Sequence, residues 1–178
     1  MPRSSAPRNR MTSPSNPIPS NPVTLRPMQA ADLEAVLALA AALQEAPHWP
    51  RAAYQDALNP AAAVQRVALV AEAGGELLGF VVASLLAPEA ELESIAVARG
   101  AQRRGVGRIL LAELCCKIGQ FDVLELRLEV RAGNLQAIAF YQATGWTACG
   151  RRPRYYVDPV EDALLLLLTL PKPSLSQS

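Results

Sequence analysis

Residues 92–118 read LESIAVARGAQRRGVGRILLAELCCKI and contain the transition that decides the fold. A β-rich segment runs to Val97, a turn with Gly105 and Gly107 follows, and leucines then recur at helical spacing up to Ile118. Gly119 is a typical helix stop. The pattern predicts a strand, a glycine-rich turn and a helix. The unpaired amides and positive dipole end of such a helix favour an anion.

The turn Gln102-Arg-Arg-Gly105-Val-Gly107 is suited to a pyrophosphate. Its glycines allow a ligand to approach the backbone, and Arg103, Arg104 and Arg108 add positive charge. No Lys-Ser or Lys-Thr follows, so the run is not a Walker loop, and it lacks the third glycine of the dinucleotide fingerprint. The alternative for the two glycines is a purely structural turn.

The segments on either side of this run complete the fold. Short β-rich or alternating segments predict strands, and apolar residues at helical spacing predict helices. The predicted strands are 23–26, 67–72, 77–86, 91–97, 124–130, 146–151 and 163–170, and further helices are predicted at 30–44, 51–58 and 134–145. This order predicts an α+β fold with a mixed, mostly antiparallel sheet of about seven strands flanked by helices.

Composition limits the number of domains and the class of partner. The chain has 178 residues, a net charge of +1 and 51% apolar residues, which suits one domain, here residues 23–170. Residues 1–22 are rich in Pro, Ser and Arg and predict a disordered tail, and residues 171–178 predict a loose one. The near-neutral charge argues against nucleic acid, and the longest apolar run, 163–170, is too short to span a membrane.

The cysteines and the histidine do not suggest a metal site. Cys115, Cys116 and Cys149 have the spacing of neither zinc ligands nor a disulfide framework, and His48 is the only histidine. We interpret the cysteines as small buried apolar residues in a helix and a strand, which suits a reducing cytoplasm.

The segment 124–130 alternates between apolar and charged residues. Its leucines and Val130 share one face of a strand, and Glu129 lies on the opposite, polar face near the carboxyl end. Asn134 follows as a good N-cap for the next helix. A carboxylate is thus expected at the end of a strand, just before a helix.

Two stretches resemble the GCN5-related N-acetyltransferase (GNAT) superfamily. The glycine-rich turn after residues 92–97 is similar to its acetyl-coenzyme A loop. Leu128-Glu-Val-Arg-Ala-Gly-Asn134, followed by Ala137-Ile-Ala-Phe-Tyr-Gln-Ala-Thr-Gly-Trp146, resembles the bacterial RimI branch, which acetylates the N-terminal alanine of a small-subunit ribosomal protein. Arg154-Tyr155-Tyr156 and Glu161-Asp162-Ala163 also fit that branch. The resemblance covers about residues 23–170 and implies the GNAT fold, in which splayed central strands bind acetyl-CoA.

The resemblance also implies roles for individual residues. The strand backbone of Ile95, Ala96 and Val97 would bind the pantetheine arm of acetyl-CoA, the cosubstrate. The pyrophosphate would be held by Gln102, Arg103, Arg104, Gly105, Val106, Gly107 and Arg108. Asn134 would contact the coenzyme across the splayed strands. Glu129 corresponds to the family's general base and Tyr141 to its general acid.

Elementary chemistry supports the same acid and base. An N-terminal amine has a pKa of about 8 and must lose a proton before it attacks a thioester; Glu129 can accept that proton directly or through water. The departing thiolate has a parent thiol pKa of about 8.5 by analogy with cysteine, so a phenol such as Tyr141 can protonate it. Cys115 and Cys116 have no histidine partner, so an acyl-cysteine route is not expected.

Both catalytic assignments have structural alternatives. For Glu129 the alternative is a solvated carboxylate paired with Arg127 or Arg131. For Tyr141 it is helix packing with the hydroxyl at the surface. These alternatives are open from the sequence alone.

The sequence therefore predicts a cytoplasmic acetyltransferase. It would move acetyl from acetyl-CoA to the α-amine of a protein N-terminus, an alanine of a small-subunit ribosomal protein, by direct attack in a ternary complex. Trp49, Tyr155 and Tyr156 would line a narrow slot for a small first residue, with packing as the alternative for all three. Two other functions stay open: acetylation of a small amine or a lysine side chain, and coenzyme binding without turnover. No metal, nucleic acid or membrane partner is expected.

Overall fold

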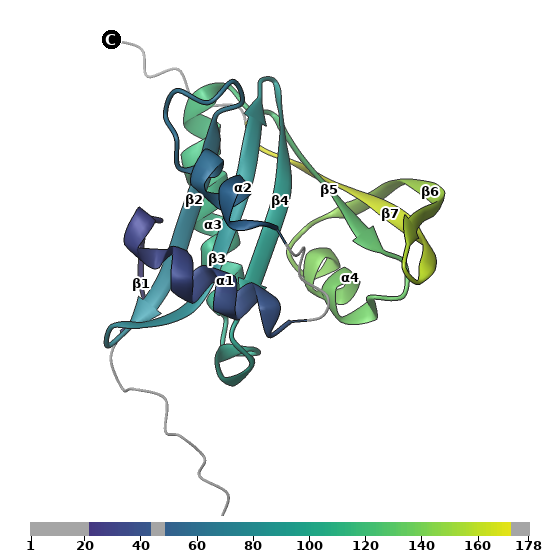
Figure 1. Cartoon of the computed structure of the whole chain (residues 1–178). Coiled ribbons are helices and arrows are strands. Elements are labelled where there is room, and N and C mark those ends of the chain that lie inside the picture. The colour runs from purple at the N-terminus through teal and green to yellow at the C-terminus, as the bar shows by residue number, and fades with distance from the viewer. Residues whose placement is uncertain (1–21, 44–48, 172–178) are drawn as a thin grey trace, which may run out of the picture.

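One sheet of seven strands organises the computed structural model, which describes residues 22–43 and 49–171 (Figure 1). The strands are β1 (Thr24–Pro27), β2 (Arg66–Ala73), β3 (Glu76–Leu86), β4 (Glu89–Val97), β5 (Glu125–Arg131), β6 (Thr147–Val157) and β7 (Val160–Thr169). Their order is β1-β2-β3-β4-β5-β7-β6, and of these neighbours β4 and β5 run parallel while the others are antiparallel. The predicted mixed, mostly antiparallel sheet is confirmed.

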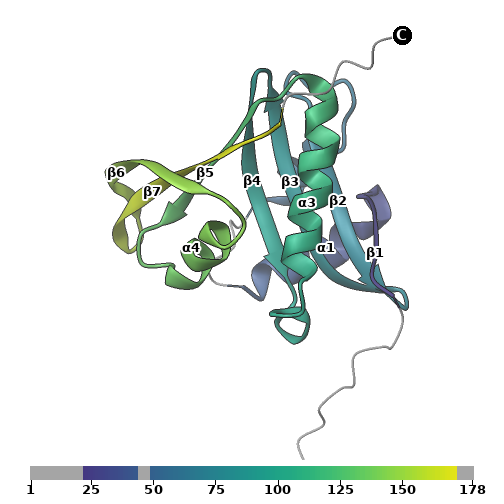
Figure 2. The ribbon, with the colours of Figure 1, turned by 180° about the vertical axis from the view of Figure 1, so that it is seen from behind.

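Helices cover both faces of the central strands (Figures 1 and 2). On one face lie α1 (Leu33–Ala41), which the short 3-10 helix η1 (Ala30–Asp32) precedes, and α2 (Arg51–Ala57). On the opposite face lies α3 (Val106–Ile118), between η2 (Arg99–Ala101) and η3 (Gly119–Phe121). Figure 2 shows α4 (Leu135–Gln142) on the same side as α3, beside the gap between β4 and β5. Within the described part of the chain, no helix has the length and apolar character needed to cross a membrane.

Each face of the sheet buries its own apolar core. The first core lies between the sheet and the pair α3 and α4, and it includes Leu114 and Leu126. The second core lies beneath α1 and α2, where Val36, Tyr54 and Phe80 have no exposed surface. Burial of one such aliphatic or phenyl side chain stabilises a fold by roughly 1.5–3 kcal/mol. The two cores therefore hold a helical layer against each face.

β4 and β5 separate after a short parallel contact. Residues 89–91 of β4 pair with residues 125–127 of β5, and no later pair joins the two strands in the described part of the chain. Instead, β5 stays in register with β7 over its full length. A bulge at Glu93 interrupts the β3–β4 register close to the point of separation, and Arg66 of β2 pairs with this carboxylate at 2.8 Å. The structure thus contains the predicted splayed central strands.

The hairpin of β6 and β7 is longer than the sequence predicts. The expected strands 146–151 and 163–170 extend in the structure to 147–157 and 160–169. Pro153 interrupts the sequence pattern because proline cannot donate to a sheet ladder. In the structure Pro153 belongs to a bulge in β6, where no ladder bond is required of it.

One carboxylate holds this bulge in place. Residues 153–155 of β6 lie opposite Asp162 of β7 alone. The Asp162 carboxylate accepts hydrogen bonds from the Arg154 backbone N–H at 2.8 Å and from Arg151 Nε at 2.7 Å. These two bonds lower the pKa of Asp162. The bulge is therefore a fixed feature of the hairpin.

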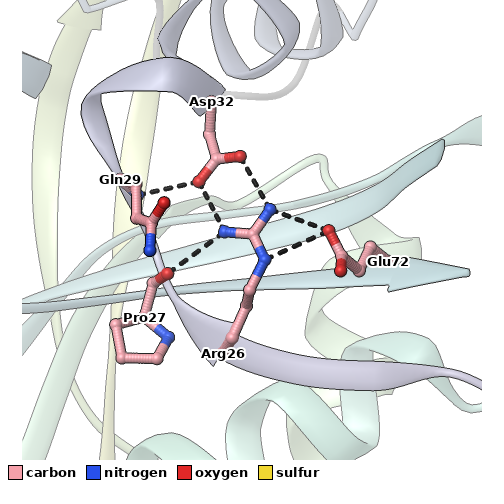
Figure 3. Close-up of polar contacts among 5 residues, drawn as sticks. All are labelled: Arg26, Pro27, Gln29, Asp32 and Glu72. Carbon is pink, nitrogen blue, oxygen red and sulfur yellow. Dashed lines mark hydrogen bonds and ion pairs between the residues drawn. The ribbon is translucent and has the colours of Figure 1, made fainter. Parts of the chain in front are cut away.

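Arg26 joins three elements at the amino-terminal side of the domain (Figure 3). Its guanidinium donates to Asp32 at 2.7 and 2.8 Å and to Glu72 of β2 at 2.7 and 3.1 Å. Asp32 also accepts the Gln29 backbone N–H at 2.7 Å, which caps η1. Hydrogen bonds from Arg26 lower the pKa of Asp32. The cluster fixes where the chain leaves β1 and enters α1.

Some predictions fall on residues outside the described ranges. The expected tails 1–22 and 171–178 lie there except for Pro22 and Pro171, and so does His48. The helix predicted at 30–44 consists of η1 and α1 and ends at Ala41.

Candidate active site

The glycine-rich turn leads directly into α3. Gly105 is the N-cap residue and has a φ of +86°, a left-handed conformation that favours glycine. No side chain of the described residues caps this end of α3, so its first amides are open to a ligand. Arg103, Arg104 and Arg108 are exposed around it. This arrangement suits an anion such as a pyrophosphate.

Gly107 has a packing role that the sequence does not reveal. A Cβ atom built on it would lie 3.3 Å from the Phe140 ring of α4 and 3.6 Å from the Val97 side chain. The first of these distances is tighter than an ordinary contact between carbon atoms. Gly107 therefore allows the start of α3 to approach α4 closely, beside the gap between β4 and β5.

Among the described residues, the strand edge that faces this gap has no strand partner, so it can bind a ligand. Ile95, Ala96 and Val97 pair with β3 on one side, whereas pairing with β5 ends at Glu91. Gln102 Nε2 donates to the Val97 carbonyl at 3.1 Å, which ties the turn to the end of the strand. Unpaired backbone groups need partners, and an extended chain that carries amides, such as pantetheine, supplies them. The groups present thus fit the predicted cosubstrate.

Glu129 lies on β5 just beyond the point where the strands separate. Its carboxylate forms an ion pair with Arg152 of β6 at 2.8 Å, and its side chain is 20% exposed. Arg127 pairs with Glu89 and Glu125 instead, and Arg131 pairs with Glu161. The alternative in which Arg127 or Arg131 pairs with Glu129 is therefore wrong. Sequence periodicity did not identify Arg152, because the bulge at residues 153–155 interrupts the alternation of β6.

A cavity of about 260 Å³ opens at Glu129. Residues of five strands, β3 to β7, line it, and its polar groups come from Glu91, Arg127, Glu129, Cys149 and Arg152 among others. Partial desolvation raises the pKa of Glu91, and the carboxylates of Glu93 and Glu129 act in the same direction. Charged groups of both signs thus surround a space large enough for part of a substrate.

Tyr141 lies on α4 with only 7% of its surface exposed. Its ring centroid is 5.3 Å from that of Phe140 and 5.4 Å from that of Trp146. Burial raises the pKa of Tyr141, with a further contribution from Tyr156, so the phenol keeps its proton at neutral pH. The ring therefore packs in the core, as the structural alternative also expects, and most of the residue is buried.

Tyr155 and Tyr156 connect the two predicted catalytic residues. Interaction with the Glu129 carboxylate raises the pKa of Tyr155. Burial raises the pKa of Tyr156, and the Glu129 charge adds to this effect. The Arg131 guanidinium lies 4.2 Å from the centroid of the Tyr156 ring. Tyr155 thus interacts with Glu129, and Tyr156 interacts with both Glu129 and Tyr141.

Two other predicted site residues have structural contacts. The Asn134 side chain accepts the Ala137 backbone N–H at 3.0 Å, which confirms it as the N-cap of α4. Trp49 packs against the second core, where its ring centroid is 5.2 Å from that of Tyr54. Trp49 and the two tyrosines of β6 do not line the cavity at Glu129, but both tyrosines interact with the Glu129 carboxylate. The structure therefore brings Tyr155 and Tyr156, but not Trp49, to the predicted base.

The cysteines differ from the sequence interpretation. Burial raises the pKa of Cys115 to about 11, so this thiol stays protonated. Cys116 and Cys149 are exposed, and the expectation that they are buried is wrong. Helical spacing places Cys116 on the solvent side of α3, and the edge strand β6 has solvent at its free side. Across residues 22–43 and 49–171, no group of three or more His, Cys, Asp or Glu side chains is arranged to hold a metal.

Comparison with known proteins identifies the family. The model of the acetyltransferase (GNAT) family matches residues 33–146. [Ribosomal protein bS18]-alanine N-acetyltransferase of Escherichia coli K12 is 38% identical over 98 residues, which are 54% of this chain and 66% of that protein. N-alpha-acetyltransferase RimI of Mycobacterium tuberculosis is 37% identical over 112 residues, which are 61% of this chain and 67% of that protein.

Solved structures agree with this result. The crystal structure of the ribosomal-protein-S18-alanine N-acetyltransferase from Escherichia coli superposes with a TM-score of 0.73 and 28% identity, over 88% of this chain and 99% of that one. Ribosomal-protein-alanine N-acetyltransferase from Brucella melitensis gives a TM-score of 0.71 and 26% identity, over 83% and 99%. The sheet, the splayed strands and the glycine-rich turn are thus those of a known fold, and the chain belongs to the acetyltransferase (GNAT) family.

Proposed function

We propose that this chain transfers acetyl from acetyl-CoA to the α-amine of a protein N-terminus. The observation that carries the proposal is the position of Glu129, at the separation of β4 and β5 and in one neighbourhood with Tyr141. The acceptor we propose is the N-terminal alanine of a small-subunit ribosomal protein, in line with the names of the similar Escherichia coli and Brucella proteins. Such an acceptor implies activity in the cytoplasm.

Acetyl-CoA would bind across the gap between the splayed strands. The start of α3 and the three exposed arginines would hold the pyrophosphate, and the free edge of residues 95–97 would bind the pantetheine amides. Asn134, at the start of α4, would contact the coenzyme from the other side of the gap. These residues orient the thioester toward Glu129.

Glu129 and Tyr141 then act on the two protons of the reaction. The carboxylate of Glu129 accepts a proton from the acceptor amine, directly or through a water, so that the neutral amine attacks the acetyl carbonyl. The carbon–sulfur bond breaks, and the Tyr141 hydroxyl gives its proton to the departing sulfur. The high pKa that burial gives Tyr141 keeps this proton in place until the thiolate forms.

The acceptor would enter through the cavity beside Glu129. Tyr155 and Tyr156 stand on one side of the site, and a slot walled by aromatic rings admits a small first side chain more easily than a large one. A free α-amine is also a chemical filter. At pH 7.5 it is deprotonated roughly a hundredfold more often than a lysine side chain.

The test compares acetylation sites on one peptide. A basic peptide that begins with Ala and contains an internal lysine is incubated with the protein and acetyl-CoA, and mass spectrometry locates the acetyl group. We expect acetylation of the α-amine well before the lysine. A matched peptide with a capped α-amine is the control, and it should stay unmodified.

Two results would redirect the proposal. Equal acetylation of the capped peptide at lysine would favour a lysine or small-amine acetyltransferase. Binding of acetyl-CoA without thiol release, with peptides of varied first residue, would indicate a coenzyme-binding module. A library in which the first residue varies from Ala to Trp measures the selectivity of the slot in the same experiment.

A further inference from the structure

We propose that Arg152 is a positioning residue: it holds the Glu129 carboxylate in the orientation in which that carboxylate accepts the proton of the acceptor amine. This inference rests on the proposed function, because it assigns Glu129 as the base. Nothing in the sequence pattern singles out Arg152. Three features of the structure identify it: its contacts, its place in the register of the sheet and the pairing of the neighbouring arginines.

The contact between Arg152 and Glu129 is direct. Arg152 Nη1 lies 2.8 Å from Glu129 Oε1, with side-chain exposures of 55% and 20%. The Arg152 guanidinium also lies 5.4 Å from the centroid of the Tyr155 ring. The attraction in this ion pair favours the orientation of the carboxylate that faces the guanidinium. Glu129 is thus held by β6, a strand that is not its direct neighbour in the sheet.

The register of β5, β7 and β6 explains how Arg152 reaches Glu129. Arg152 pairs with Ala163 and Glu129 pairs with Leu165, so the two side chains lie on the same face of the sheet, two residues apart along β7. Residues 153–155 bulge opposite Asp162, and the Asp162 carboxylate fixes the backbone of Arg154 and the side chain of Arg151. Bulges commonly redirect side chains near active sites. Arg152 comes directly before this bulge and Tyr155 is its last residue, and both interact with Glu129. The β6–β7 hairpin therefore holds Arg152 in place as the partner of Glu129.

The other arginines nearby are engaged elsewhere. Arg127 lines the same cavity, but it pairs with Glu125 at 2.7 Å and with Glu89 at 3.1 Å. Among the described residues, Arg152 alone forms an ion pair with Glu129. The carboxylate of Glu91 is close enough to interact unfavourably with Glu129. Without Arg152, this repulsion would turn the Glu129 carboxylate away from its observed position.

The first experiment compares Arg152→Gln, Arg152→Lys and the control Arg127→Gln. Arg127 is a matched control because it lines the same cavity, is similarly exposed and has other partners. We expect Arg152→Gln to lower kcat by roughly tenfold or more, since small misplacement of a catalytic group costs up to about a hundredfold. KM for the peptide should change little. Arg152→Lys should restore part of kcat. Arg127→Gln removes a charge from the same cavity but breaks no ion pair of Glu129, so it should lower kcat by clearly less than Arg152→Gln does.

A double-mutant cycle then tests whether Arg152 acts through Glu129. In the Glu129→Gln background, Arg152→Gln should cause no further loss of kcat, because groups that act as a unit are not additive. Additive losses would overturn the proposal. A rise in KM with unchanged kcat would also overturn it, since Arg152 would then contact the acceptor. So would equal losses in Arg127→Gln, which would indicate a general effect of cavity charge.

A measurement without turnover separates this inference from the proposed function. The carboxyl carbon resonance of Glu129, assigned by its absence in Glu129→Gln, should move in Arg152→Gln and stay in place in Arg127→Gln. If no peptide is acetylated but the resonance moves as expected, the ion pair stands and the proposed acceptor is wrong. If peptides are acetylated and the resonance does not move, Arg152 does not hold Glu129 and the inference fails.

Discussion

Tyr141 shows how one residue can serve both packing and chemistry. Its ring contacts Phe140 and Trp146 in the first core, and burial raises the pKa of its hydroxyl. A buried phenol that keeps its proton suits a general acid, because it releases the proton only to a strong base such as a thiolate. A substitution that removes only the hydroxyl can separate the packing role of the ring from the acid role of the hydroxyl.

The substitution Tyr141→Phe keeps the ring and removes the proton donor. We expect turnover to fall by about 10²- to 10⁴-fold, the typical value of general acid catalysis, with acetyl-CoA affinity nearly unchanged. Steady-state kinetics and calorimetry measure the two effects. Tyr54→Phe is the control, because Tyr54 lies in the second core and should not affect turnover. A loss of affinity that equals the loss of turnover would contradict the role of Tyr141 as acid.

Glu129→Gln keeps the shape of the side chain and removes its basicity. At pH 7.5 the acceptor amine is mostly protonated and needs a base, whereas at about pH 9.5 it is already neutral. The defect of Glu129→Gln in kcat/KM should therefore shrink as the pH rises. Glu125→Gln, on the same face of β5 and paired with Arg127, is the control. A defect that is the same at both pH values would show that Glu129 positions the acceptor and is not its base.

At the scale of elements, the contact between α3 and α4 controls the coenzyme gap. The two helices come from either side of β5 in the sequence, and Gly107 and Phe140 bring them together. The turn before α3 depends on Gly105 for a different reason, which is its positive φ. Nothing lies within 4 Å of a Cβ atom built on Gly105. Gly105 is therefore needed for its backbone conformation and not for close packing.

Two substitutions at Gly107 separate packing from charge. Gly107→Ala should press on Phe140 and destabilise the fold by about 1 kcal/mol, as a mild case of overpacking. Gly107→Glu adds negative charge where the phosphates would bind, so its acetyl-CoA affinity should fall further, and the additional loss should lessen with salt. Gly119→Ala, at a helix end with open space, is the control and should be close to neutral. Unchanged affinity in a folded Gly107→Glu variant would remove the phosphate assignment.

At the scale of the whole molecule, two layers of helices are held to one sheet by separate means. The α3 side relies on the larger apolar core, and the α1 side adds ion pairs to its core. Arg26 links β1, η1 and β2 (Figure 3). Arg66 links β2 to Asp56 of α2 and to Glu93 of β4. Removing one charged side chain from such a cluster leaves the opposite charges of the remaining side chains without a partner.

The pH dependence of stability should report on the Arg26 cluster. Hydrogen bonds from Arg26 lower the pKa of Asp32 in the folded state, so its contribution is present above the unfolded value of about 3.9 and is lost as pH falls through the lower folded value. Asp32→Asn should be less stable than wild type by about 1–3 kcal/mol at pH 7. The difference should vanish near pH 2, by urea unfolding. Asp56→Asn, whose carboxylate is largely exposed, should show little effect. A pH-independent difference would contradict this account.

Features that depend on neighbours in the chain could be predicted from the sequence alone. The strands β1 to β5, the helix α3 and the N-cap role of Asn134 were predicted close to their observed positions. The polar face of β5 that carries Glu129 follows from its period of two. Periodicity, capping and glycine conformation act over a few residues, and therefore they can be read without knowing the fold. The resemblance added Tyr141 and the coenzyme loop.

Only the tertiary structure decided which residues meet across the chain. Arg152, and not Arg127 or Arg131, pairs with Glu129, because the register of β5, β7 and β6 places the two side chains on one face of the sheet, two residues apart along β7. Gly107 meets Phe140 because two helices that are separate in the sequence pack on one side of the splayed strands. Such contacts depend on register and crossing geometry, where a shift of one residue moves a side chain to the opposite face of a sheet. Local sequence patterns do not determine this register or crossing geometry. The packing energy of the whole domain determines them.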